Sequence, residues 1–224
     1  MKTDINETDN IKSIQQIKEK LLKEIIKNFY CKHDDVLSVK ELRDLKQNIL
    51  NCKYLAVNNL NRDFISTKGF SLVFKASGIE QVKKQFPFFN KYLELALDPY
   101  CNAFYLNPLL MNSDTSRVDS HIDRSLRSYL KTIETPLIVS VMYVEVPENI
   151  IGGELVLSHN KKNVGQIKPK ENTLVYFQGH LTHSVNQMKV NSNRLSLVCE
   201  QYRLEEDELR SIPEFKIESR KLKY

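Results

Sequence analysis

The hydrophobic positions in the first half of the chain recur at helical spacing. Between residues 11 and 30 they follow one another mostly at three- or four-residue steps, with Lys and Glu in the gaps. This pattern predicts an amphipathic helix. A second helix is expected over residues 38–51, where Glu41 stands three positions after Ser38 as in a capping box. A third helix is expected from Ser77 to about residue 97, interrupted at Pro87.

The pattern changes after Pro99 to short, β-branched apolar runs separated by turn residues. The predicted strands cover residues 103–111, 137–146, 154–158, 164–167, 173–177 and 194–203, with a shorter candidate at 70–75. Strands of this length and spacing are typical of a jelly-roll sandwich or barrel. We therefore expect one α+β domain over 1–224, with mainly helical support in 1–99, a β core in 100–204 and a charged tail of helical character in 205–224.

Composition and charge exclude several classes of protein but do not indicate a binding partner. The 224 residues include 33 Lys and Arg against 28 Asp and Glu, a net charge of +5 that is spread along the chain. A nucleic-acid-binding protein would show a denser basic patch. No apolar run is long enough to span a bilayer, and the polar start lacks the apolar core of a secretory signal. We expect a cytoplasmic protein whose 4 cysteines are reduced thiols.

Three residues have the types and spacing of a metal site. His121 and Asp123 lie two positions apart, so in a strand or its extended end their side chains point the same way. His183, after the predicted strand 173–177, would complete a set of two histidines and one carboxylate. Such a set leaves positions open on the metal, as in non-haem Fe(II) oxygenases. His180 is a competing ligand, and a histidine in this region can equally be a loop residue without a metal role.

Arg194 begins the last strong strand and shares one of its faces with Ser196 and Val198. A cation inside a small barrel is costly unless it is paired. A guanidinium there favours a bound carboxylate, which it can hold through a bidentate contact. If the strand instead exposes this face, Arg194 is a surface cation.

The order of the motifs along the chain is a more specific indication of a protein family than any single motif. His-x-Asp at 121–123 comes first, Gly-Gly-Glu-Leu at 152–155 follows, then His183, and Arg-x-Ser at 194–196 comes last. In this order the chain resembles the 2-oxoglutarate/Fe(II)-dependent dioxygenase superfamily, and in particular its prolyl-4-hydroxylase-like branch. The resemblance covers residues 100–204 and implies a double-stranded β-helix, a jelly-roll or cupin-like fold, with helices packed outside.

The resemblance also implies a role for each matching residue. By this resemblance the metal ligands are His121, Asp123 and His183, and the residues that bind 2-oxoglutarate are Arg194, Tyr143 and Ser196. Fe(II), 2-oxoglutarate and O₂ are the implied cofactors, with ascorbate as a further candidate.

Two features depart from the family pattern. The interval between His183 and Arg194 is slightly longer than expected, and Met111 stands where some relatives have a tyrosine. Tyr105 and Asn107 share the parity of Met111 and are candidates to replace that tyrosine.

The expected function is hydroxylation of an unactivated C–H bond with release of succinate and CO₂. The substrate would be a small molecule or a peptide, namely an amino acid or a peptidyl residue with proline favoured. The sequence leaves that choice and the oligomeric state open. The alternative is a non-catalytic cupin-like binding module. A nucleic-acid demethylase of the same superfamily would have a second arginine six positions after the first, but Glu200 stands there.

Three parts of the sequence are candidates for substrate contact. Arg124 and Arg127 directly follow the metal motif and either bind an acidic group or lie in a solvated loop. The segments 58–68 and 112–120 are polar and loop-like, as substrate-binding loops commonly are.

Overall fold

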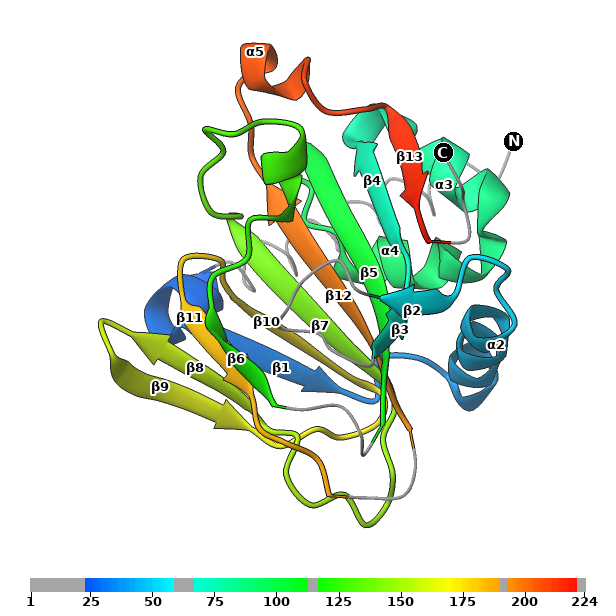
Figure 1. The fold of residues 1–224 in the computed structure, drawn as a ribbon, viewed down its shortest axis with the longest axis vertical. Helices are drawn as coiled ribbons and strands as arrows, with labels where there is room; N and C mark the ends of the chain where they lie inside the picture. Colours follow the sequence, from blue (N-terminus) through cyan, green and yellow to red (C-terminus); the bar gives the residue numbers. More distant parts are fainter. Residues whose placement is uncertain (1–22, 59–66, 113–116, 190–192, 221–224) are drawn as a thin grey trace, which may run out of the picture.

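Two antiparallel sheets, packed face to face, form the centre of the computed structural model (Figure 1). The structure describes residues 23–58, 67–112, 117–189 and 193–220. In these residues the major sheet runs in the order β1 (Tyr30–Asp34), β10 (Thr173–Gln178), β7 (Ile138–Glu145), β12 (Arg194–Tyr202), β5 (Ala103–Met111), β3 (Thr67–Gly69) and β2 (Ala56–Asn58). Strand β4 (Ser71–Lys75) pairs with β5 and with β13 (Phe215–Glu218). The minor sheet has the order β6 (Val118–His121), β11 (Thr182–Val185), β8 (Leu155–His159) and β9 (Lys162–Ile167).

Three helices gather on the side of the major sheet away from the minor sheet (Figure 1). They are α2 (Val39–Leu50), α3 (Ile79–Gln85) and α4 (Asn90–Ala96). Their buried side chains pack in one apolar core with the outward-facing residues of β12, Leu195, Leu197 and Cys199. The inward-facing residues of β7 and β10 pack instead against β8 and β9 of the minor sheet. The expected α+β fold, a double-stranded β-helix with helices packed outside, is confirmed.

Two of the predicted helices are found with the expected details. Helix α2 begins after Ser38, whose hydroxyl accepts a hydrogen bond from the Glu41 amide while the Glu41 carboxylate accepts one from the Ser38 amide. Pro87 separates α3 from α4, because proline cannot continue the hydrogen bonding of the preceding turn. A short 3₁₀ turn, Pro87–Phe89, links the two helices.

The first 99 residues contain more strand than the helical pattern predicts. The helix predicted over residues 11–30 is present over 23–28, and its residues 11–22 lie outside the described part. It ends at Phe29, which has a positive φ of 68°. Tyr30 then opens β1, which supplies hydrogen-bond partners to the backbone of β10 along its whole length. The hydrophobic spacing therefore overextended this helix and missed the strand that follows it.

The C-terminal tail is also less helical than expected. Only the short helix α5 (Glu206–Leu209) is found among its described residues. Strand β13 then pairs with β4 and extends the major sheet. The pairing satisfies backbone groups at the edge of β4, which explains why a charged segment here is a strand.

Three further expectations concern membrane-spanning helices, the state of the cysteines and the cellular location. In the described part of the chain, no helix is long and apolar enough to cross a bilayer. The 4 cysteines are free, and burial raises the pKa of the Cys31 thiol to about 12. The cytoplasmic location stays a prediction.

The strand register brings the candidate site residues together. His121 on β6 lies opposite His183 on β11. On the major sheet, Ser196 of β12 lies opposite Tyr143 of β7, and Arg194 lies opposite Met111 of β5. All of these side chains reach the space between the two sheets, where they line one cavity.

Candidate metal centre and its cavity

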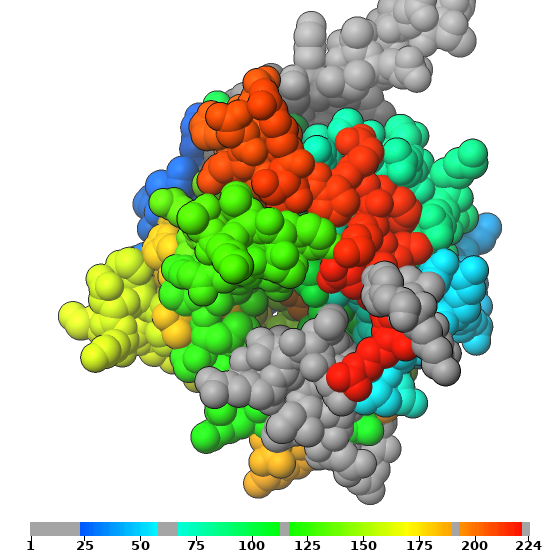
Figure 2. Space-filling view, turned by 45° about the horizontal axis from the view of Figure 1, so that its top comes forward, coloured from blue at the N-terminus to red at the C-terminus, as the bar shows by residue number. Residues whose placement is uncertain are grey.

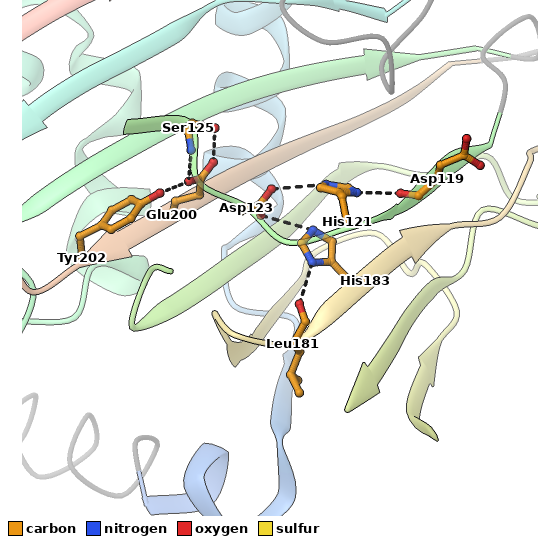
Figure 3. A network of polar contacts seen from close by, with 8 residues as sticks. All are labelled: Asp119, His121, Asp123, Ser125, Leu181, His183, Glu200 and Tyr202. Carbon is orange, nitrogen blue, oxygen red and sulfur yellow. Dashed lines mark hydrogen bonds and ion pairs between the residues drawn. The ribbon is translucent and has the colours of Figure 1, made fainter. Parts of the chain in front are cut away.

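Two imidazoles and a carboxylate meet at one point between the sheets (Figure 3). One ligand atom from each of His121, Asp123 and His183 lies within 4.8 Å of the others. The Asp123 carboxylate oxygens lie 3.4 Å from His121 Nε2 and 3.3 Å from His183 Nε2. The centroids of the two imidazole rings are 4.3 Å apart. Three groups that metals bind in proteins thus converge on one spot.

Hydrogen bonds to the backbone set which nitrogen of each imidazole faces the cluster. His121 Nδ1 lies 2.7 Å from the Asp119 carbonyl oxygen, and His183 Nδ1 lies 3.3 Å from the Leu181 carbonyl oxygen. A carbonyl oxygen can only accept, so both Nδ1 atoms carry the proton. Both Nε2 lone pairs are left for a metal, the arrangement that orients histidine ligands in metal sites.

The electrostatics of Asp123 favour its charged form. Burial alone would raise the pKa of this carboxyl, but the imidazoles of His183 and His121 outweigh burial and hold the pKa well below its ordinary value. The carboxylate is therefore ionised at neutral pH and available as an anionic ligand.

The cluster opens into a cavity of about 540 Å³, its mouth included, between the two sheets. Most of the remaining wall is apolar and includes Leu109, Val139, Val141, Leu155, Phe177 and Val198. In the space-filling view the surface is hollowed beside the green segment that contains β6 and the turn after it (Figure 2).

Arg194, the first residue of β12, lines one end of the cavity beside Met111 and is 4% exposed. One of its terminal nitrogens donates to the Gly153 carbonyl at 2.7 Å, and the other lies 2.9 Å from Met111 Sδ. Its guanidinium carbon lies 5.8 Å from the centre of the Tyr143 ring, within the range of a cation–π contact. Among the described residues, no carboxylate forms an ion pair with it. Burial lowers the pKa of Arg194.

Two buried polar atoms at this end of the cavity lack a hydrogen-bond partner within the described chain, Arg194 Nε and Ser196 Oγ. Native structures rarely leave such atoms unsatisfied. A dicarboxylate such as 2-oxoglutarate fits this end, because a carboxylate would satisfy both atoms and neutralise the guanidinium. The two imidazoles and the carboxylate equally fit Fe(II), which nitrogen and oxygen ligands of this kind suit. The residues present therefore suit both groups.

The structure also places the residues that the sequence left as alternatives. His180 is exposed and packs against His159, with ring centroids 5.3 Å apart, so it does not join His121 and Asp123. The Tyr105 hydroxyl accepts a hydrogen bond from Ser71 at 2.6 Å. Met111 itself, rather than Tyr105 or Asn107, lines the cavity.

The candidates for substrate contact stay largely undecided. Neither Arg124 nor Arg127 is among the described residues that line the cavity, and Arg127 is exposed. Residues 59–66 of the first segment, 58–68, and residues 113–116 of the second, 112–120, lie outside the described residues. The second segment is less loop-like than expected, because its last three residues belong to β6, and Val118 lines the cavity.

Sequence reasoning missed the groups that hold these side chains in place. Arg194 donates to the Gly153 carbonyl and to the Met111 thioether. Neither acceptor belongs to a recognisable sequence motif. The Glu200 carboxyl accepts a hydrogen bond from Ser125 beside the metal cluster, and the sequence pattern shows at this position only that the second arginine of a demethylase is missing. The alternation of β12 did place Glu200 on the same face as Arg194, and this was the available signal.

The comparisons with known proteins agree with this geometry. Residues 108–199 match the model of the 2OG-Fe(II) oxygenase superfamily. This range contains all six residues proposed for iron and 2-oxoglutarate. No curated protein sequence matches the chain significantly.

Solved structures show the same fold at low sequence identity. A prolyl-4-hydroxylase from Pseudomonas putida is 13% identical, with a TM-score of 0.55, over 84% of this chain and 100% of its own. A prolyl hydroxylase from Trichoplax adhaerens, in complex with a peptide fragment of a hypoxia inducible factor, is 15% identical, with a TM-score of 0.57, over 90% of this chain and 95% of its own. An oxidoreductase of the 2OG-Fe(II) oxygenase family from Burkholderia pseudomallei has a TM-score of 0.54 at 13% identity, over 84% of this chain and 90% of its own.

The match over residues 108–199 and the His-Asp-His site point to the same class of protein, the 2-oxoglutarate-dependent non-haem iron oxygenases. Within that class its fold is that of the prolyl-4-hydroxylase-like branch. The comparisons support the expected enzyme class, a non-haem iron oxygenase, and Fe(II), 2-oxoglutarate and O₂ are the cofactors that this class implies. Ascorbate stays a prediction.

Proposed function

We propose that this protein hydroxylates an unactivated C–H bond of an amino-acid-like substrate, with a prolyl residue of a peptide favoured over a free amino acid. The observation that carries the proposal is the single cavity that joins the His121, Asp123 and His183 cluster to a buried, unpaired Arg194. Bound Fe(II), 2-oxoglutarate and O₂ supply the chemistry, an oxidative decarboxylation that yields succinate and CO₂ and inserts oxygen into the C–H bond.

The chain contributes binding, orientation and exclusion of water. In the proposal, His121, Asp123 and His183 hold the metal, and the Nδ1–H bonds to backbone carbonyls keep both imidazoles oriented. Arg194 binds the distal carboxylate of 2-oxoglutarate, with the hydroxyl groups of Tyr143 and Ser196 assisting it. Tyr143, which is 1% exposed, forms part of the dry wall next to Arg194. The apolar lining excludes water from the reacting groups.

The peptide preference has separate support. The Trichoplax adhaerens protein with the same fold was solved with a peptide bound. The surface is hollowed beside the segment with β6, the strand that carries His121, and a peptide substrate requires such an opening (Figure 2). We also propose that residues 1–224 form a single domain, because β1 to β4 and β13 pair into the same sheet as β5 and β12.

A succinate-release screen tests the substrate class. Purified protein with Fe(II) and 2-oxoglutarate is expected to release succinate faster with short proline-containing peptides than with free L-proline or with no substrate. Mass spectrometry should find one added oxygen atom on the prolyl residue. Peptides in which alanine replaces that proline are the matched control. A protein that turns over free amino acids but none of the peptides would contradict the preference.

A further inference from the structure

A second carboxyl group, that of Glu200, lies buried beside the metal cluster (Figure 3). It accepts three hydrogen bonds. The Ser125 amide donates to Oε2 at 3.0 Å, the Ser125 hydroxyl donates to Oε1, and the Tyr202 hydroxyl donates to Oε2. Ser125 therefore binds both oxygens of the carboxyl group, so the residue is held in orientation as well as in position.

The burial of this group is costly. Glu200 is 3% exposed, and burial, together with the nearby Asp123 carboxylate, raises its pKa to about 8. Among the described residues, no lysine or arginine forms an ion pair with it. An acid without a basic partner is a poor way to stabilise a fold, since an apolar side chain would fill the same space at lower cost. The role of Glu200 therefore depends on which groups its hydrogen bonds hold in place.

Those hydrogen bonds hold the turn that carries Asp123. Strand β6 ends at His121, so His121 is fixed by its pairing with His183. Asp123 lies beyond the end of the strand, two residues before Ser125, in a segment that has no strand pairing. The turn Ser125–Ser128 that follows is anchored by the buried Leu126, but apolar packing alone has little directional preference.

The other end of the contact is rigid. Glu200 belongs to β12, which is paired along its length with β5 and β7. Arg194 and Ser196 lie on the same face of the same strand. One paired strand thus carries the groups at the 2-oxoglutarate end of the cavity and also the group that holds the turn at the metal end.

We propose that Glu200 is a positioning residue, which fixes the Ser125 turn and through it the carboxylate of Asp123 relative to the two histidines. The inference rests on the proposed role of Asp123 as a metal ligand. Glu200 acts through Ser125 and does not itself bind the metal, 2-oxoglutarate or the substrate.

Metal binding measured with Mn²⁺ and Co²⁺ tests this role. Glu200→Leu and Ser125→Ala are each expected to weaken Mn²⁺ binding by about 10- to 100-fold, the usual effect of removing a group that orients a ligand. The Co²⁺ absorption spectrum should change as well, because it reports the ligand geometry. Glu200→Gln keeps one carbonyl acceptor for Ser125 and should restore part of the affinity.

The matched control is Ser128→Ala. Ser128 lies in the same turn, is exposed, and donates to the Ser125 carbonyl at 3.3 Å without touching Glu200. It should leave Mn²⁺ affinity and the Co²⁺ spectrum unchanged. The double variant with Glu200→Leu and Ser125→Ala should lose little more Mn²⁺ affinity than either single variant, because both substitutions remove the same contact.

Two outcomes separate this inference from the proposed function. If His183→Ala abolishes Mn²⁺ binding while Glu200→Leu and Ser125→Ala keep the affinity and spectrum of the wild type, only the positioning role is wrong. If His183→Ala leaves Mn²⁺ binding intact, the metal assignment itself fails. Urea unfolding of the metal-free variants detects a general loss of stability, and a spectrum that changes only in proportion to that loss would also overturn the positioning role.

Discussion

His183→Ala is expected to abolish Fe(II) binding and to lower succinate formation by more than about 100-fold, beyond the loss caused by removing a group that merely orients a ligand. The reason is geometric. His183 Nε2 is one of three ligand atoms in the cluster, and the alanine leaves only His121 and Asp123 to hold the metal. Isothermal titration of metal-free protein with Fe(II) under argon measures the affinity, and chromatography measures succinate.

His180→Ala is the matched control for this change. His180 is also a histidine, lies three positions earlier in the same segment, and is exposed. Its replacement should leave both metal affinity and succinate formation at the wild-type level. The reverse result, with His180 essential and His183 dispensable, would show that the wrong histidine has been assigned to the metal.

Arg194→Met should raise the KM for 2-oxoglutarate by about 100-fold or more while metal binding persists. Each charge-assisted hydrogen bond contributes about 1.5–3 kcal/mol, and about 1.4 kcal/mol corresponds to a factor of ten. Two such bonds to a carboxylate therefore account for the expected factor. Initial rates of succinate formation over a range of 2-oxoglutarate concentrations give the KM.

The free energy of unfolding gives a second readout for Arg194→Met. The metal-free variant should stay within about 1 kcal/mol of the wild type. Removing an unpaired buried cation stabilises the fold, whereas losing the hydrogen bond to the Gly153 carbonyl destabilises it. Arg203→Met, at an exposed position just after β12, is the control and should change neither quantity. An unchanged KM for Arg194→Met would contradict its role in binding 2-oxoglutarate.

The sequence was most informative where chemistry depends on short-range spacing. His121 and Asp123 could be paired from their two-residue interval, and Arg194 and Ser196 from strand alternation, because both are local properties of the backbone. The apolar run at 103–111 predicts the bounds of β5 to the residue, because this run is long and has turn residues on either side. The helix at 38–51 was located because its capping box marks its start.

What the sequence could not show depends on contacts between distant segments. Strand β11 has four residues and no clear alternation, so its pairing with β6, which sets His183 against His121, became visible only in the fold. Strand β1, of which only Tyr30 falls in the predicted helix, shows no clear strand pattern until β10 is placed beside it. The contact between Glu200 and Ser125 joins residues 75 positions apart. Tertiary pairing overrode local pattern in each case.

The pairing of β12 on both sides limits how this site can change in length. Deleting one residue between Arg194 and Glu200, with the register to β5 and β7 preserved, would exchange the two faces of the strand beyond the deletion. Glu200 would then point toward the helices. Substitutions on the inner face of β12, or insertions in the connection before Arg194, would change the pocket without exchanging the two faces of the strand.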